Sequence, residues 1–423
     1  MSQTPLADRQ ETAPVHGPLP SRLIGIGVAL MVLMPLAMWL ANRSATLVLG
    51  LAAVSFVAVA IAAGRKGALA GGAGRLLATP LGLTLAAFLA WALVSILWSH
   101  NPVASLRAWG ELALPVVFAL VIAASGRFRP QPAWLRALAL AIILACLLAI
   151  FELASGLSQR AALGVGKLMS FVFNRPAITA LVLAVPTIHG LWNLPGARRS
   201  DRILAVVLAL AVAALALRSE SASARLGVAV CAICWGMSAL WPRLTLTAAG
   251  CAFLLAMAVA PVLGVAAQNW LPSLILNRFA VMTGQARIDI WQSFGEVARA
   301  RPIAGAGFGT SATMHQHPVA AEVSPAHRQL LAASHPHDMP LQAWAETGAV
   351  GAGILTLAGL FLLARLRRLP VREMAPRLAL FAGAFAISVV GHGAWQGWWI
   401  AVLGGAILWF GPGAAVPQGE DHG

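Results

Sequence analysis

The chain has 423 residues, enough for two or three soluble domains. Hydrophobic residues make up 59% of the chain and charged residues only 10%, whereas a soluble fold carries about 25% charged residues, so the composition excludes a soluble protein and indicates a polytopic membrane protein. The formal charge of +15, from 29 Lys+Arg against 14 Asp+Glu, therefore needs an explanation within a membrane protein.

Apolar segments follow one another along most of the chain. A spanning helix needs about 20 largely apolar residues, and the sequence predicts an all-α bundle of about twelve such helices over residues 23–411. We interpret 1–22 and 412–423 as disordered tails, and we expect no cleavable signal peptide because the first apolar run is long enough to span. The predicted spans are 23–41, 45–63, 81–98, 110–125, 134–154, 176–194, 203–217, 226–241, 244–266, 346–364, 377–393 and 395–411.

One long polar segment interrupts this pattern. Residues 267–345, between the ninth and tenth predicted spans, are too polar to cross a membrane and too long for a simple turn. An even number of spans places both termini on one side, which carries 17 Lys and Arg, against 7 in the short loops of the other side. Because positive residues favour the cytoplasmic side, we predict cytoplasmic termini and a periplasmic or extracellular loop at 267–345.

Two arginines are predicted at the outer edge of the bundle, where such residues usually face a cavity. Arg175 follows Asn174 and precedes Pro176, which suits the first turn of a helix, so Arg175 would lie at the outer mouth of the bundle. Its alternative role is to snorkel to the lipid headgroups. Arg225 follows Ser223 in a short polar link between the seventh and eighth spans, where a simple helix cap is the alternative interpretation.

A third arginine opens a helical segment inside the long loop. Arg287, Trp291 and Phe294 share one face at helical spacing, so the guanidinium could stack on the indole and be held rigid. An amphipathic helix lying at the membrane interface is the alternative. Arg278, earlier in the same loop, is a weaker candidate.

Glycines and histidines mark the end of the loop. Residues 302–310 are glycine-rich, but no strand precedes them and no P-loop lysine follows, so we predict a turn that uses positive φ angles. His335 and His337 lie just before the tenth predicted span, on the same side as the outer arginines, which favours a functional role. Five histidines in one loop suggest zinc, but the helical HExxH spacing and cysteine are both missing there, so we expect no metal.

In chain order, these segments resemble the O-antigen ligase/O-antigen polymerase family of bacterial inner-membrane proteins. The resemblance covers most of 80–365 and rests on Trp98-Ser99-His100-Asn101-Pro102, Asn174-Arg175, Ser223-Ala224-Arg225, Arg287 with Trp291, Pro302 with Gly305 and Gly307, His337-Asp338 with Leu341-Gln342, and Glu346 with Gly348. The family usually has Asn or Ser after its histidine. Asp338 departs from that pattern, and a carboxylate at this place would raise the pKa of His337.

The resemblance implies a GT-C-like glycosyltransferase of the bacterial inner membrane that acts at the periplasmic face in lipopolysaccharide biosynthesis. The implied donor is a polysaccharide on undecaprenyl diphosphate, and the implied acceptor is a sugar of lipid A-core. Membrane lipids surround the protein, and no nucleic-acid partner is expected. His337 would be the catalytic base, and Arg225 and Arg287 would stabilise the leaving diphosphate. The expected substrate-binding residues are Arg175, Asn174, Ser223, Trp291, Arg278, His335 and Asp338.

Catalysis is expected to need no cofactor. Other membrane transferases with lipid-linked donors often hold a divalent metal with carboxylates in their first outer loop, and that loop here, residues 41–45, has no acid. We therefore predict metal-independent catalysis in which arginines replace the cation. Direct displacement without a protein nucleophile implies inversion at the anomeric carbon.

Three other functions remain open. A chain-elongating O-antigen or exopolysaccharide polymerase would use the same donor and a similar site. A protein O-oligosaccharyltransferase would transfer the glycan to Ser or Thr. A transporter or flippase is the alternative from a different class, but the polar features of this sequence gather on one side of the predicted membrane, whereas transporters usually show midplane charges or two similar halves.

Overall fold

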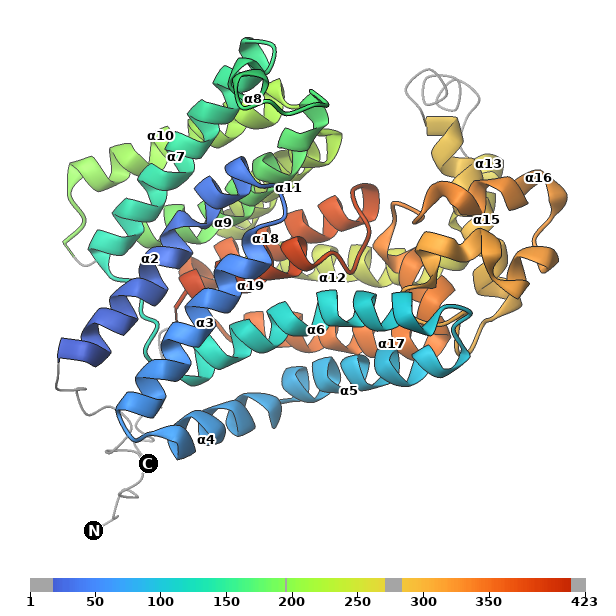
Figure 1. Ribbon diagram of the computed structural model, residues 1–423, viewed down its shortest axis with the longest axis horizontal. Helices are drawn as coiled ribbons and strands as arrows, with labels where there is room; N and C mark the ends of the chain where they lie inside the picture. Colours follow the sequence, from blue (N-terminus) through green and yellow to red (C-terminus); the bar gives the residue numbers. More distant parts are fainter. Residues whose placement is uncertain (1–17, 195, 271–283, 412–423) are drawn as a thin grey trace. The chain divides into compact units, whose positions relative to one another are not determined.

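The structure is a computed structural model that describes residues 18–194, 196–270 and 284–411, and within those ranges it contains helices and no strands (Figure 1). Eleven of the described helices are long and apolar enough to cross a membrane. The prediction of an all-α polytopic membrane protein is therefore confirmed. The twelfth predicted span, 395–411, coincides with α19 (Gly397–Trp409), an apolar helix of 13 residues, shorter than the roughly 20 residues of a typical span.

Proline and glycine set many of the helix boundaries. Pro102 and Pro132 open helices, because proline lacks only an N–H that has no helical partner in the first turn. Gly64 and Gly126 follow helix ends with φ angles of 65° and 62°, in the left-handed region that glycine enters without strain. These signals explain why the apolar runs of the sequence end where the helices end.

The chain forms two compact units, which are described separately. Of the described residues, unit 1 comprises 18–79, 114–194, 196–219 and 397–411, and unit 2 comprises 80–113, 220–270 and 284–396. The helix α6 (Pro102–Ala124) contributes residues to both.

Unit 1 is organised around its most buried helix. Within the span Ser170–Trp192, 72% of an 18-residue apolar window is buried, and α9 packs against α2, α7, α10 and α19. The helices of unit 1 besides α6 are α2 (Pro18–Leu40), α3 (Ala45–Ala62), α4 (Lys66–Leu77), α7 (Pro132–Ala154), α8 (Ser158–Ala162), η2 (Ser170–Phe173), α9 (Asn174–Trp192), α10 (Arg199–Arg218) and α19.

Unit 2 contains the pair α11 and α18, which pack closely over their length. Gly383 makes this possible, because a Cβ there would meet the sulfur of Cys231. The helices of unit 2 besides α6 are α5 (Pro80–Val94), η1 (Ser95–Trp98), α11 (Ala222–Leu240), α12 (Pro242–Val259), η3 (Ala260–Val262), α13 (Leu263–Trp270), α15 (Gly284–Ala300), η4 (Thr310–Gln316), η5 (Pro318–Glu322), α16 (Pro325–Arg328), η6 (Gln329–Ala333), α17 (Met339–Leu366) and α18 (Val371–Val390).

The described part of the long polar segment, residues 267–270 and 284–345, is a compact helical region rather than an open loop. Its helices α13, α15 and α16 gather at one end of unit 2 (Figure 1). A hydrophobic core joins α15 to the neighbouring 3₁₀ helices and α17, and Phe294, Val297, Met314 and Leu331 are fully buried in it. Phe294 therefore packs inside this region and is not available to a substrate. That the region is periplasmic stays a prediction.

The helix after this region differs from the predicted span 346–364. α17 begins at Met339, and its helical geometry is interrupted at Gly348, where φ is 63° and ψ is −167°. A side chain at Gly348 would collide with the carbonyl of Ile303, so glycine is required both for the backbone conformation and for the close approach. The break separates a short helical segment, which carries site residues, from the apolar part of α17.

Candidate functional site

His337 lies in the junction before α17 in an unusual backbone conformation. Its φ angle is 54°, in the left-handed region that residues other than glycine rarely adopt. Its Nδ1 lies 2.7 Å from the carbonyl oxygen of Gly391, the residue that follows α18. A carbonyl can only accept, so Nδ1 carries the proton and Nε2 of the neutral ring keeps its lone pair. The ring also contacts that of His335 edge to face, with centroids 4.1 Å apart.

Burial and the nearby Arg287 keep His337 neutral near pH 7. Burial is the larger and lowers the pKa of His337, because the charged imidazolium loses hydration. The hydrogen bond to Gly391 acts in the opposite direction, and the positive charge of Arg287 lowers the pKa further. The combination of a lowered pKa and an unprotonated Nε2 is what a general base requires.

Asp338 has a structural role that its place in the sequence does not reveal. It is the N-cap of α17, and its carboxylate accepts a hydrogen bond from the backbone N–H of Leu341 at 2.7 Å. Burial raises the pKa of Asp338 itself to about 7. The expectation that Asp338 raises the pKa of its neighbour was wrong, because Asp338 is directed toward the helix terminus and the pKa of His337 is lowered.

Arg287 and Trp291 connect α15 to the same region. Nη1 of Arg287 donates to the carbonyl of Val390 at 2.7 Å, and the indole N–H of Trp291 donates to the carbonyl of Pro336 at 3.1 Å. The predicted stacking of this arginine on the indole is not found among the described side chains, because each is held by a different carbonyl. Val390 and Gly391 are consecutive, so Arg287 and His337 meet at the end of α18.

Arg225 approaches the same end of α18 from α11. The two helices are antiparallel, since Cys231 is hydrogen-bonded to Ala379 and a Cβ at Gly383 would lie 3.3 Å from the carbonyl oxygen of Gly227. The start of α11 therefore lies on the same side of the helix pair as Val390, at the end of α18. Arg225 is exposed in the first turn of α11.

Ser223 is part of the cap of α11. The Ser221 hydroxyl is the N-cap, accepting from the backbone N–H of Ala224 at 3.0 Å, and it lies 3.0 Å from the Ser223 hydroxyl. The predicted helix cap is therefore present beside the exposed Arg225.

The turn between α18 and α19 is the functional feature that sequence reasoning missed. Its residue Ala394 donates its N–H to Gln342 at 2.9 Å, and Trp395 donates its indole N–H to Glu346 at 2.8 Å. At Gly393 a Cβ would lie 2.6 Å from Cδ2 of His335. The turn is thus fastened to the first turns of α17, and this holds the Gly391 carbonyl against His337.

The carboxylate of Glu346 is the point where the turn and α17 are joined by hydrogen bonds. It is fully buried, and each of its oxygens accepts two hydrogen bonds. One oxygen accepts from Gln342 and from the backbone N–H of Ser311, and the other accepts from Trp395 and from the backbone N–H of Gly309. Glu346 and Gln342 belong to the motif that carries the family resemblance, but their shared role in joining three segments requires the structure.

Replacing Glu346 with glutamine should lower the free energy of unfolding by about 1–3 kcal/mol. The amide nitrogen would face two donors where the carboxylate oxygen accepted both, and two buried groups would lose their partner. The thermal unfolding midpoint of the purified protein in detergent measures this. Glu322→Gln is the control, since it alters an exposed ion pair with Arg301, and its midpoint should change little. Equal midpoints for the two variants would contradict the assigned role of Glu346.

The glycine-rich segment is the turn that the sequence predicts. Gly305, Gly307 and Gly309 have φ angles of 70°, 105° and 72°. Its N–H groups are used internally, because those of Ala306 and Gly307 donate to the carbonyls of Ala345 and Glu346 at 2.8 and 2.9 Å. These groups therefore bind α17 and not a phosphate.

Asn174 and Arg175 open α9 in unit 1. Nη1 of Arg175 lies 3.5 Å from the side-chain oxygen of Asn42, and its guanidinium is 5.5 Å from the ring centroid of Trp398. The side-chain oxygen of Asn174 is buried and has no hydrogen-bond partner among the described residues. His337, Arg225 and Arg287 belong to unit 2, so the convergence of Arg175 with them stays a prediction. Arg278 lies outside the described residues.

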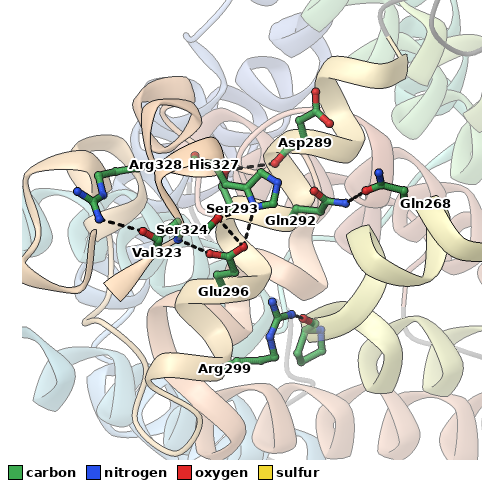
Figure 2. A network of polar contacts seen from close by, with 11 residues as sticks. Gln268, Asp289, Gln292, Ser293, Glu296, Arg299, Val323, Ser324, His327 and Arg328 are labelled. Atoms are coloured by element: carbon green, nitrogen blue, oxygen red, sulfur yellow. Dashed lines mark hydrogen bonds and ion pairs between the residues drawn. The ribbon is translucent and has the colours of Figure 1, made fainter. Parts of the chain in front are cut away.

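The other histidines of the region predicted as a long loop each make structural contacts of their own. His317 accepts from the backbone N–H of Val319 at 3.0 Å, and His315 contacts its neighbour Gln316. The ring of His327 is directed at a carboxylate oxygen of Glu296 (Figure 2), and Nδ1 lies 2.6 Å from that oxygen. Among the described residues, no three His, Cys, Asp or Glu side chains are grouped to hold a metal ion. Metal-independent catalysis stays a prediction.

The Glu296 network stabilises the region that presents Arg287 and Trp291. Burial alone would raise the pKa of Glu296, but hydrogen bonds from the Ser324 N–H, the Ser324 hydroxyl and His327 outweigh burial and lower that pKa. The carboxylate therefore stays ionised and joins the middle of α15 to the start of α16 (Figure 2).

Part of the chain is similar to a known protein family. Residues 203–356 match the family model described as O-antigen ligase, and no curated protein matches the chain. The matched region contains Arg225, Arg287 and His337. The chain is therefore a polytopic membrane protein in which these residues are similar to the O-antigen ligase family, as the sequence motifs indicate.

Proposed function

We propose that the protein transfers a polysaccharide from undecaprenyl diphosphate to a sugar hydroxyl of lipid A-core. The observation that carries this proposal is the pairing of a neutral histidine with an arginine at the end of α18. Gly391 fixes the tautomer of His337, and the adjacent Val390 holds Arg287. A base and a permanent positive charge are the two groups that displacement of a lipid diphosphate needs.

The chemistry is a direct displacement. Nε2 of His337 takes the proton of the acceptor hydroxyl as its oxygen bonds to the anomeric carbon of the donor glycan. The bond between that carbon and the diphosphate oxygen breaks, and its electron pair leaves with undecaprenyl diphosphate. The proton on His337 then passes to water. Attack from the side opposite the leaving group inverts the anomeric centre.

Arginine suits the stabilisation of this leaving group. A guanidinium is permanently charged and can bind phosphate oxygens through two parallel hydrogen bonds. Arg287 has one N–H engaged with Val390, which fixes its position and leaves other N–H groups for a phosphate. The exposed Arg225 would add a second guanidinium, and Arg175 and Asn174 would also bind substrate. No divalent metal is needed in this scheme.

The proposed location follows from the same chemistry. The protein would lie in the bacterial inner membrane with cytoplasmic termini, and the site would open to the periplasm, where the lipid-linked glycan and lipid A-core meet. Ser223, Trp291, His335 and Asp338 would shape the substrate-binding surface. Of these, Trp291 and Asp338 act by holding the backbone on either side of His337.

The direct test is a gel of lipopolysaccharide from a strain that lacks the protein. Loss of a ligase leaves bare lipid A-core while polymer accumulates on its lipid carrier. Loss of a polymerase instead leaves core that carries single repeat units, and loss of a protein-directed transferase leaves lipopolysaccharide unchanged. Either of these last two patterns would contradict the proposed acceptor.

The acid limb of the pH–rate profile should have its midpoint below pH 6.5, the ordinary histidine value of about 6.5 being lowered by burial and by Arg287. The sign follows from the role of a base, because activity is lost as pH falls through the pKa and the ring becomes protonated. Measurement of kcat/KM against pH on the purified protein reports this pKa for the free enzyme. A midpoint above pH 6.5 would contradict the assigned environment of His337.

A further inference from the structure

A polar pocket with a volume of about 480 Å³ lies in unit 2, beside the helix that carries Arg287. Its walls belong to α13, α15 and α16. Cavities of roughly 300–1,000 Å³ are typical of small-molecule sites, whereas a single metal ion is held by ligands only about 2–2.6 Å away. The size of the pocket therefore suits an organic ligand. Its polar lining residues are Gln268, Asn269, Asp289, Gln292, Glu296 and His327.

The helix α15 separates this pocket from the proposed reaction site. Asp289, Gln292 and Glu296 recur at spacings of three and four residues, so they share the face of α15 that lines the pocket. Arg287 and Trp291 lie on the opposite face, because successive residues of a helix turn by about 100°. A ligand in the pocket would therefore be held by the helix that carries Arg287 without contacting that arginine.

The walls on both sides of α15 are fixed by contacts. On one side, α13 approaches so closely that a Cβ at Gly264 would lie 2.5 Å from the backbone nitrogen of Gln292. On the other side, Glu296 accepts from the backbone N–H of Ser324 at 2.6 Å and lies 2.6 Å from Nδ1 of His327 (Figure 2). The lining groups are therefore held in place before a ligand binds, which lowers the entropic cost of binding.

The lining groups offer hydrogen-bond donors and acceptors together. The side-chain nitrogen of Gln292 donates to the side-chain oxygen of Gln268, so the oxygen of Gln292 can accept from a ligand and the nitrogen of Gln268 can donate to it (Figure 2). The exposed amide of Asn269 can do both. A divalent cation needs acceptors only and a phosphate needs donors only, whereas a hydroxyl group donates and accepts. The mixture therefore favours a ligand that carries several hydroxyl groups.

The charge of the lining also distinguishes between ligands. Asp289 and Glu296 are acidic, and no Lys or Arg lines the pocket in the described part of the chain. Hydrogen bonds keep the pKa of Glu296 low, so its carboxylate is ionised. A phosphate or another anion would be repelled by these carboxylates, whereas an uncharged ligand would not.

We propose that the pocket binds an uncharged sugar residue of the glycan substrate, away from the bond that is formed in transfer. This inference rests on the proposed function, which makes a glycan the substrate of this region. Adjacent sugar hydroxyls match the amides of Gln268, Asn269 and Gln292, and a site built to bind hydroxyls rejects analogues that lack them. The pocket would thereby select among glycans without taking part in the displacement.

The first test measures the binding of free glycans to the purified full-length protein in detergent by saturation-transfer NMR. The probes are the O-antigen repeat-unit oligosaccharide and the core oligosaccharide of the bacterium that makes the protein, and the probe that binds identifies the source of the sugar. Asn269→Ala/Asp289→Ala should raise its Kd at least about tenfold, because two hydrogen-bonding side chains are lost. Gln316→Ala/Glu322→Ala removes an exposed amide and an exposed carboxylate elsewhere in the same region and should leave the Kd unchanged.

The second test measures steady-state transfer. Because the sugar in the pocket does not react, Asn269→Ala/Asp289→Ala should raise the KM for one substrate and leave kcat near the wild-type value. The substrate whose KM rises must be the one whose free glycan binds. A fall in kcat with an unchanged KM for both substrates would contradict a role in binding.

Three binding results would overturn the proposal. These are no binding of either oligosaccharide, equal binding by the double variant and its control, and binding of calcium or magnesium alone that the double variant loses, which would assign the pocket to a cation. Free glycans bind without transfer, so their failure to bind to a protein that transfers glycan would contradict the pocket alone. A polymerase pattern in the strain that lacks the protein would contradict only the proposed acceptor.

The thermal unfolding midpoint separates binding from folding. The double variant should unfold at the same temperature as its control. If the double variant is less stable, Asn269→Ala must raise the Kd by itself for the proposal to stand, since this side chain is exposed.

Discussion

Replacement of His337 with alanine should lower the rate of glycan transfer by about 10²–10⁴-fold, the usual contribution of a positioned general base. Without the imidazole, the acceptor hydroxyl must lose its proton to water during attack on the anomeric carbon. The hydrogen bond to Gly391 is also lost, but a single bond of this kind contributes only about 1 kcal/mol to stability, so the variant should remain folded. Transfer measured with the purified protein, together with its thermal unfolding midpoint, checks both statements.

A matched control separates chemistry from the general effect of removing a histidine. His315 is exposed and its ring lies 3.1 Å from the side-chain nitrogen of its neighbour Gln316, so His315→Ala should transfer glycan at the wild-type rate. Full activity in His337→Ala would remove the proposed base. Equal loss of activity in both variants would point to stability of the helical region around α15 and α16 as the cause.

Replacement of Arg287 with alanine should lower kcat by about 10²–10³-fold, the effect of deleting one preorganised group that stabilises developing charge. Negative charge on the diphosphate grows as the bond to the anomeric carbon breaks, so the loss should appear in kcat more than in KM. Arg287→Lys keeps the charge but loses the planar fork, and it should recover part of the activity. Steady-state kinetics with the lipid-linked donor measure these effects.

Arg299 on the same helix provides the control for this variant. Its guanidinium also donates to a backbone carbonyl, that of Pro261 at 2.8 Å, but it lies at the other end of α15. Arg299→Ala should therefore reproduce any structural consequence of losing an arginine–carbonyl contact while leaving kcat near the wild-type value. If Arg287→Ala and Arg299→Ala slow transfer equally, the assigned role of Arg287 in charge stabilisation is wrong.

The sequence predicts where helices occur better than it predicts where they begin, end or break. Apolar runs of span length and the prolines that open helices were sufficient to predict the all-α membrane class. The break of α17 at Gly348 was not predicted, because it depends on the approach of Ile303 and not on the residues around it. The compact core of the region near Phe294 was missed for a related reason, since polar composition hides the few apolar residues that meet only after folding.

The sequence indicated the side chains of the candidate site, but not the backbone carbonyls and buried residues that position them. His337 and Arg287 were identified by residue type and order, and the structure brings them to adjacent carbonyls at the end of α18. Those carbonyls carry no sequence signal, because every residue has one. Glu346 and Trp395 were likewise not recognised as supports, since their contact joins positions 49 residues apart.

Asp338 shows how adjacency in sequence can mislead an electrostatic argument. A carboxylate next to a histidine suggests a raised histidine pKa, but the left-handed conformation of His337 separates the directions of the two side chains. Asp338 caps α17, and His337 is directed to Gly391. Burial, with a smaller contribution from Arg287, therefore lowers the pKa of His337, while the hydrogen bond to Gly391 acts in the opposite direction.

The most direct test of the proposed function is transfer by the purified protein in vesicles. The reaction contains undecaprenyl-diphosphate-linked glycan and lipid A-core, with a chelator present, and the products are separated by gel electrophoresis. We expect the wild-type protein to form glycan-bearing lipid A-core and release undecaprenyl diphosphate, and His337→Ala to form it about 10²–10⁴-fold more slowly. Elongation of the lipid-linked glycan without transfer to lipid A-core, or transfer that requires added magnesium or manganese, would contradict the account.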